Sequence, residues 1–328
     1  MKNLILLFVL LIQSNVFGQN SISIKSTDTL QFAPDSSYSR AILKVKNSLY
    51  FGTSKNGVVK YDLESKNTET IIQANEGEFR DLNFSKGNII AIESGDNGII
   101  STYHANSVQK TTFAKEFFDD ICTNKKGTII LADPIGGYFK IHYIPSKKGK
   151  KAPKLPTIRC FKNEACFAAS GTTASLNGNR YSFVSGGGKT ARYHSFILDK
   201  PETYFSIDLP LQLGESAGPY SLLQLDEQNI IVVGGDYTKQ NERKGTCAIS
   251  ADGGKTWKES TENPNGYRSC VVGTKDLLFI CGTNGIDYSL DGGNTWKSFK
   301  RGNFCALLLD GKSLYATTNK GYCLRYNF

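Results

Sequence analysis

The sequence predicts an all-β fold, and its composition and residue pattern support that prediction. The apolar residues lie in short runs interrupted by Gly, Asn, Asp and Lys, and many are β-branched or aromatic. Methionine occurs once, at the first position. With 39% hydrophobic and 21% charged residues in a chain of 328, the composition is that of a foldable, soluble protein. It excludes disorder, collagen and a multi-span membrane protein.

An internal repeat predicts the architecture. In each unit a polar loop is followed by an aromatic residue that opens a short apolar strand. The seven opening residues are Tyr38, Phe79, Phe118, Phe167, Tyr220, Tyr267 and Phe304. Their mean spacing of about 44 residues matches a four-stranded propeller blade. We therefore predict a seven-bladed β-propeller, with six blades as the alternative.

The two ends of the repeat region complement each other. The last unit, residues 304–328, has room for only three strands, whereas residues 23–32 form a lone extended segment before the first unit. We expect this segment to pair with the last blade and close the ring, because closure removes exposed sheet edges. A single propeller domain over residues 19–328 follows.

Residues 1–18 predict a secretory signal peptide. Lys2 precedes an apolar stretch at 4–12, which is far shorter than the roughly 20 residues that span a bilayer. The predicted mature chain begins at Gln19, and the absence of a nearby cysteine argues against a lipoprotein anchor. We expect export to the periplasm or the medium. No later segment is expected to span a membrane.

Export makes disulfides possible among the eight cysteines. Cys160 and Cys166 bracket a short loop, and Cys270 and Cys281 would face each other across a hairpin that turns at residues 273–276. For the other four, small buried thiols are an equally good interpretation.

Two octapeptides, 250–257 and 289–296, share the pattern Ser-x-Asp-Gly-Gly-x-Thr-Trp. The Asp side chain can bond turn amides, the glycines permit positive φ, and the Trp can pack back across a hairpin. We expect structural turns and no catalysis from Ser250, Asp252, Gly254, Trp257, Ser289, Asp291, Gly293 and Trp296.

These octapeptides resemble the Asp boxes of bacterial neuraminidase repeats, which also occur in sialidases, sortilin-type receptors and photosystem II assembly-factor propellers. Further segments, including 79–81, 117–119, 167–170, 234–239 and 266–269, occur in an order that resembles a family of exported bacterial propellers commonly labelled "oxidoreductase". The resemblance covers almost all of the mature chain and implies a propeller that assists assembly of a larger complex. This chain departs from the pattern because Asp boxes occur only in blades five and six.

The motifs of enzymes are incomplete. No dinucleotide-binding Gly-rich turn is present, so no cofactor is expected and the oxidoreductase label has no motif behind it. Residues 186–190 resemble the end of a phosphate loop and 214–218 a nucleophile elbow, but neither has the required flanking sequence, and we interpret 186–190 as a blade turn. The three isolated histidines predict no metal site. Two facing carboxylates could still hydrolyse an envelope or extracellular glycan, sialidase-like or otherwise, which is the alternative function.

The net charge of +9 is spread along most of the chain, which argues against nucleic-acid binding. The one dense run, between Lys147 and Lys154, stands where blade three could carry an Asp box. It could hold phosphate-rich lipid or polysaccharide, but we favour a solvated loop tip.

The binding hypothesis rests on loop geometry. In a propeller, the loop before each first strand and the loop between the second and third strands open on one face, around the central channel. The charged and aromatic residues expected on this upper face are Arg80, Asp81, Asp119, Asp133, Asp236, Tyr237 and Arg268. They favour a protein or peptide partner. An alternative stays open, in which Arg80 and Arg268 pair with Asp119 and Asp133 across the channel and only hold the blades together.

Overall fold

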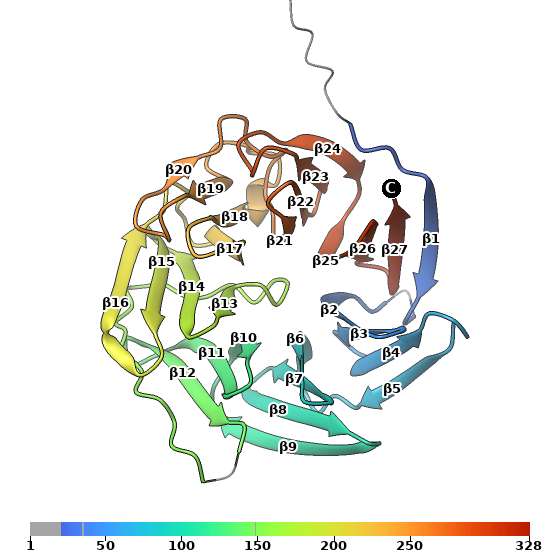
Figure 1. The fold of residues 1–328 in the computed structure, drawn as a ribbon, viewed down its shortest axis with the longest axis horizontal. Helices are drawn as coiled ribbons and strands as arrows, with labels where there is room; N and C mark the ends of the chain where they lie inside the picture. The colour runs from blue at the N-terminus through green and yellow to red at the C-terminus, as the bar shows by residue number, and fades with distance from the viewer. Residues whose placement is uncertain (1–20, 35, 148) are drawn as a thin grey trace, which may run out of the picture.

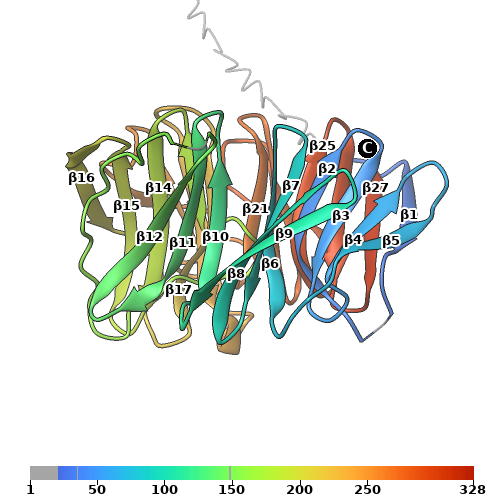
Figure 2. The same ribbon diagram turned by 90° about the horizontal axis from the view of Figure 1, so that it is seen from below.

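The computed structural model describes residues 21–34, 36–147 and 149–328, so the predicted signal peptide lies outside the described residues. The described chain folds into seven antiparallel sheets arranged as blades around a channel (Figure 1). The prediction of a seven-bladed, all-β propeller is confirmed. Figure 2 shows the strands running between the two faces of the ring.

Each blade is a meander that starts at the channel. Blade 1 contains β2 (Ser39–Val45), β3 (Ser48–Thr53), β4 (Val58–Asp62) and β5 (Thr68–Ile72). Blade 2 contains β6 (Glu78–Ser85), β7 (Asn88–Ser94), β8 (Asn97–His104) and β9 (Ser107–Ala114). Blade 3 contains β10 (Phe118–Thr123), β11 (Gly127–Ile135) and β12 (Tyr138–Pro145). Blade 4 contains β13 (Ala174–Asn177), β14 (Arg180–Gly187), β15 (Thr190–Ile197) and β16 (Lys200–Asp208). Blade 5 contains β17 (Ala217–Gln224), β18 (Ile230–Asp236), β19 (Cys247–Ser250) and β20 (Lys258–Glu259), with the 3₁₀ turn η1 (Tyr237–Lys239) after β18. Blade 6 contains β21 (Cys270–Thr274), β22 (Leu277–Gly282), β23 (Gly285–Ser289) and β24 (Lys297–Arg301), and blade 7 contains β25 (Phe304–Asp310), β26 (Ser313–Thr318) and β27 (Tyr322–Asn327).

The ring closes as the sequence predicts, because β1 (Ser26–Gln31) forms the outer strand of blade 7. It pairs antiparallel with β27, with Leu30 opposite Cys323. Leu30 and Phe32 are buried in a cluster that also contains blade 1 residues, and the Phe32 ring stacks on Phe51 at 4.2 Å. The N-terminal strand therefore joins the last blade to the first through both hydrogen bonds and apolar packing.

Side chains at the channel link neighbouring inner strands. Asp81 Oδ2 in blade 2 accepts a hydrogen bond from Ile121 N in blade 3, at 2.8 Å. Asp120 Oδ2 repeats the contact one blade on, accepting from Thr173 N at 2.7 Å. These contacts satisfy inner-strand amides that have no sheet neighbour on that side.

The predicted strand start at Phe167 in blade 4 is wrong. Its inner strand begins at Ala174, seven residues after Phe167, and the preceding loop reaches toward the centre of the ring (Figure 1). Gly171 in this loop has φ +62, and a Cβ there would lie 2.2 Å from Asp81 Oδ1. The aromatic residue at 167 therefore belongs to a loop over the channel and opens no strand.

Blade 3 has three strands, unlike the other six blades. Among the described residues after β12, backbone hydrogen bonding to that strand lies near residues 158–160, where Phe139 N donates to Ile158 O at 3.0 Å. Pro153 and Pro156 have no amide hydrogen to donate, so the segment cannot continue as a regular fourth strand.

All eight cysteines are free thiols in the structure. Cys270 and Cys281 lie opposite each other in the predicted β21–β22 hairpin, and both are buried. Cys160 is instead fixed next to blade 3, where its amide donates to Gly137 O, while Cys166 lies at the channel. Among the described residues, no helix has the length and apolarity needed to cross a membrane.

Shortening Leu30 tests the ring closure. Leu30→Ala should lower the free energy of unfolding by about 2–5 kcal/mol, because it removes buried methyl groups from the joint between the first and last blades. Thr29→Ala, at an exposed position of the same strand, should change it by less than about 0.5 kcal/mol. Denaturant unfolding of the purified variants measures both values, and equal effects would contradict the proposed role of β1.

Candidate functional site

The upper face, where the inner strands start, contains a pocket over the channel. This central pocket has a volume of about 330 Å³. Its lining contains two guanidinium groups, from Arg40 and Arg80, and no carboxylate. The rest of the lining is mostly aromatic or small: Phe117, Cys166, Phe167, Ala168, Ala169, Tyr220, Tyr237, Tyr267 and Thr283.

β-Bulges aim side chains into the channel. The pairing of β2 with β3 shifts between Ser39 and Ala41, and that of β6 with β7 shifts between Phe79 and Asp81. Arg40 and Arg80 are therefore the extra residues at equivalent positions of two neighbouring blades. A bulge re-aims its extra residue relative to the alternation of the strand. That Arg40 and Arg80 lie near each other in the channel could not be predicted from their separation in the sequence.

The two arginines share one carboxylate. Arg80 Nη2 lies 2.9 Å from Glu78 Oε2, whereas Arg40 Nε lies 3.9 Å from the same oxygen. Burial and the Arg40 charge lower the pKa of Arg80. Nε of each arginine is buried without a hydrogen-bond partner in the described residues. The two guanidinium groups of the central pocket therefore share Glu78 as their ion-pair partner and retain two unsatisfied donors.

The arginines also hold the loop before β13 across the channel. Arg80 Nη1 donates to Ala168 O at 3.0 Å, and Arg40 Nη1 to Ala169 O at 3.4 Å. On the other side, Ser170 Oγ donates to Ser269 O in blade 6 at 2.6 Å. Blades 1, 2 and 6 thus fix the floor of the central pocket.

Three tyrosines and a phenylalanine form the other wall. The Phe167 and Tyr220 rings stack at 4.2 Å, and Tyr267 meets Tyr220 edge-on at 4.8 Å. Tyr237 follows β18 and is 55% exposed, with its ring 6.4 Å from that of Tyr267. Burial raises the pKa of Tyr220 and Tyr267, so both are neutral phenols at physiological pH. Such amphipathic rings suit contact with a polypeptide.

Asp119 and Asp133 lie behind the pocket lining. Asp119 is fully buried, neither carboxylate oxygen has a hydrogen-bond partner in the described residues, and burial followed by the Asp133 charge raises its pKa well above the usual range. Burial raises the pKa of Asp133 to about 6, although a hydrogen bond from the Cys166 backbone and the Arg80 charge oppose the shift. Neither forms an ion pair with Arg80, which pairs with Glu78.

Arg268 lies at the entry of blade 6 but is buried and does not line the central pocket, so the expected convergence is wrong for this residue. It is 1% exposed, and its Nη2 lies 2.5 Å from Asp287 Oδ2 in the same blade. Cys270, which pairs with Cys281, is the first residue of β21, and Arg268 lies two residues before it. In blade 2, the buried Phe79 likewise lies two residues before Asp81, which pairs with Ile92. A one-residue difference in register reverses the face of a side chain. The channel-crossing pairs left open by the sequence, Arg268 with Asp119 or Asp133, therefore do not form.

Asp81 and Asp236 have local partners. Asp81 is buried in the contact between blades 2 and 3. Asp236 caps η1, accepting from Thr238 N at 2.9 Å and from Ser216 Oγ at 2.7 Å. Its side chain sets the position of Tyr237 at the rim of the central pocket.

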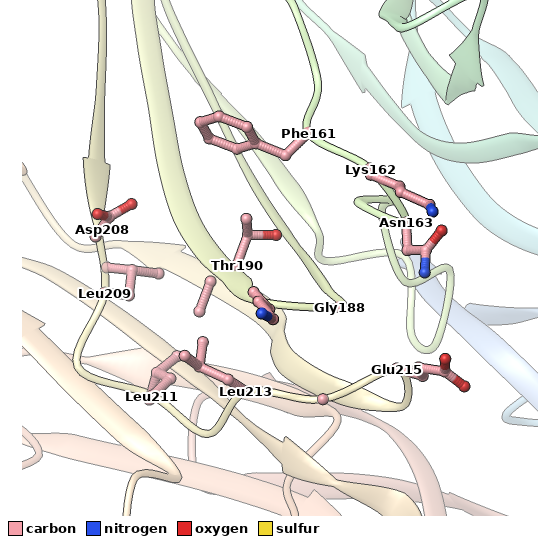
Figure 3. Close-up of a pocket in the computed structure, with 13 residues that line it drawn as sticks. Phe161, Lys162, Asn163, Gly188, Thr190, Asp208, Leu209, Leu211, Leu213 and Glu215 are labelled. Carbon is pink, nitrogen blue, oxygen red and sulfur yellow. The ribbon is translucent and has the colours of Figure 1, made fainter.

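A larger pocket lies beside the central one on the same face. Residues 161–163, 188–191, 208–209, 211 and 213–215 line this lateral pocket, which has a volume of about 930 Å³ (Figure 3). Phe161 and Leu213 are each 58% exposed. Both precede an inner strand by several residues, so the lateral pocket lies between the upper edges of blades 4 and 5. The lining includes residues 188–190 and 214–215 of the enzyme-like motifs 186–190 and 214–218. The first motif forms the β14–β15 turn, as expected.

A Ser–His–Glu group beside this pocket was not predicted from the sequence. Ser185 Oγ donates to Glu164 Oε1 at 2.6 Å and lies 2.7 Å from His194 Nε2. Arg192 binds both oxygens of Glu164 at 2.7 Å. Ser185 is fully buried, and burial lowers the pKa of His194 to about 4. The group anchors the chain at residue 164 to blade 4, and no substrate can reach its hydroxyl.

The two octapeptides form the β19–β20 and β23–β24 turns. Asp252 Oδ1 accepts from Thr256 N, and Asp291 Oδ1 accepts from Thr295 N, both at 2.9 Å. Trp296 is buried between blades 5 and 6. Because the strands alternate in direction, these turns lie on the lower face, opposite the central pocket.

Comparisons with known proteins show the fold. No protein-family model matches the sequence, and no curated protein matches it significantly. A structure of YCF48 bound to D1 peptide is 13% identical, with a TM-score of 0.59 over 94% of this chain and 99% of that chain. Virginiamycin B lyase from Staphylococcus aureus is 11% identical (TM-score 0.63, 92% and 99% covered), and BamB from Moraxella catarrhalis is 13% identical (0.53, 88% and 84%). At these identities the likeness shows the β-propeller fold alone.

The half-buried Asp133 predicts a pH-dependent stability. Its pKa is about 6 in the folded protein and close to 3.8 when unfolded, so its favourable contribution is complete below pH 4 and is lost as pH rises through 6. Asp133→Asn keeps the neutral form at every pH. The free energy of unfolding of this variant minus that of wild type should therefore rise by about 1–3 kcal/mol from pH 4 to pH 7.5. Denaturant unfolding at both pH values measures the gain. Asp96→Asn, at an exposed position, should show none, and a pH-independent difference for Asp133→Asn would refute the prediction.

Proposed function

We propose that this protein is an exported interaction module that binds a protein or peptide on the upper face of its propeller. The observation that carries the proposal is the central pocket, where two arginines with unsatisfied Nε donors adjoin an aromatic wall. A carboxylate of the partner would pair with the two guanidinium groups, whose side chains are only partly buried, and the tyrosines would contact its apolar groups. The lateral pocket extends the same face with exposed Phe161 and Leu213.

The resemblance to exported Asp-box propellers supports a role in the assembly of a larger complex. The YCF48 structure contains a bound D1 peptide, which is a precedent for peptide binding by a propeller of this shape. The predicted signal peptide supports a partner in the periplasm or outside the cell.

Glycan hydrolysis is less well supported. It needs two carboxylates that face each other in an open pocket. Asp119 is buried outside the lining of the central pocket, and Asp208 and Glu215 lie on opposite sides of the lateral pocket (Figure 3).

Site-specific photocrosslinking tests the binding face. A photoreactive phenylalanine analogue replaces Tyr237 at the rim of the central pocket or, as the control, Leu290 on the lower face; both side chains are exposed. After irradiation in an envelope extract, mass spectrometry should identify a protein crosslinked from position 237 and absent from position 290. Crosslinks from position 290 alone, or the same set from both positions, would contradict the proposal.

A further inference from the structure

The lower face contains a lysine-lined groove between blades 3 and 4. Six exposed lysines, namely Lys125, Lys126, Lys147, Lys150, Lys151 and Lys200, line a cavity of about 580 Å³. Asp199 is the single carboxylate in the lining, and its Oδ1 accepts a hydrogen bond from Lys154 N at 3.1 Å. We call this feature the basic groove.

The lysines of the basic groove are not neutralised by the protein. Within the described part of the chain none of the six forms an ion pair, and Lys126 Nζ donates to the neutral Asn179 Oδ1. Like charges gathered in a concave site raise the local potential and attract anions. The groove therefore favours a ligand with several negative charges.

The groove also has fixed ends. Ser146 N donates to Lys126 O at 2.9 Å, which ties the start of the loop to the β10–β11 turn. At the other end, Asp199 N donates to Lys154 O at 3.3 Å, which ties the loop to blade 4. The two ends of the lysine-bearing loop, at Ser146 and Lys154, are therefore held against blades 3 and 4.

This loop occupies the chain position where the other blades have a fourth strand. Apart from the isolated bridge between Tyr138 and Arg159, the outer edge of β12 has no strand partner among the described residues. Tyr143 and Pro145, at the end of that edge, line the groove. An unpaired edge offers backbone groups that only another polypeptide can use in β-strand addition.

We propose that the basic groove binds an acidic, extended polypeptide segment. Its carboxylates pair with the lysines, and its backbone approaches the free end of β12. A lipid surface would be too flat to enter a groove, and a glycan could use the lysines but not the strand edge. The site is separate from the central pocket because it lies on the opposite face.

Binding of fluorescein-labelled decaglutamate, followed by anisotropy, tests this proposal on the purified protein. Lys126→Gln/Lys150→Gln/Lys200→Gln should weaken binding at least tenfold. Lys55→Gln/Lys86→Gln/Lys255→Gln removes the same charge from exposed positions elsewhere and should change it by less than twofold. Affinity should also fall as salt is added. Equal losses in the two triple variants would overturn the proposal by showing a general charge effect.

Two further arms distinguish other ligands and the other face. Arg40→Gln/Arg80→Gln should retain decaglutamate binding, and loss of binding there alone would move the ligand to the central pocket. A sulfated hexasaccharide should displace the peptide only at higher concentration. Tighter, lysine-dependent binding of the hexasaccharide, or of phosphatidylglycerol vesicles, would overturn the choice of a polypeptide. Because the crosslinking test concerns the upper face, the two proposals fail separately.

Discussion

The pairing of β1 with β27 is the constraint on which the rest of the structure depends. It joins the two ends of the described chain, and Arg325 reinforces it through Asp28. Blades 1 and 2 pack directly on each other, and closure holds them opposite the loop that precedes β13. The two arginines of the central pocket come from those blades and grip that loop. If the ring opened, the pocket would lose both its walls and its floor.

Much of the fold could be predicted from the sequence, because spacing and turn residues are local signals. The blade number, the closing strand, the β21–β22 hairpin and the β14–β15 turn follow from them. The loop over the channel could not be predicted, since Phe167 lies in an apolar run like any strand start. The missing fourth strand of blade 3 had a sequence signal in Pro153 and Pro156, whose effect depends on which strand they would join.

The candidate site was harder to predict because one residue of register decides where a side chain points. Arg80 sits at a bulge and enters the channel, whereas Arg268 occupies the position of Phe79 and is buried against Asp287. Arg40 follows the first opening residue by two positions, and only the bulge in β2 brings it beside Arg80. Aspartate is a residue type common on surfaces, but Asp81 lies in an inter-blade contact, Asp119 is buried, and Asp236 caps a local turn. Tyr237 alone of the upper-face set is widely exposed.

The central claim is that Arg40 and Arg80 form the core of a surface that binds a protein or peptide. The most direct measurement is the affinity of the crosslinked partner, once produced as a pure protein, for wild type and for Arg40→Gln/Arg80→Gln. Arg301→Gln serves as an exposed control outside the pocket. The account predicts a loss of at least tenfold in affinity for the double variant, with unchanged folding, and no loss for the control. Equal affinity of all three proteins would contradict it.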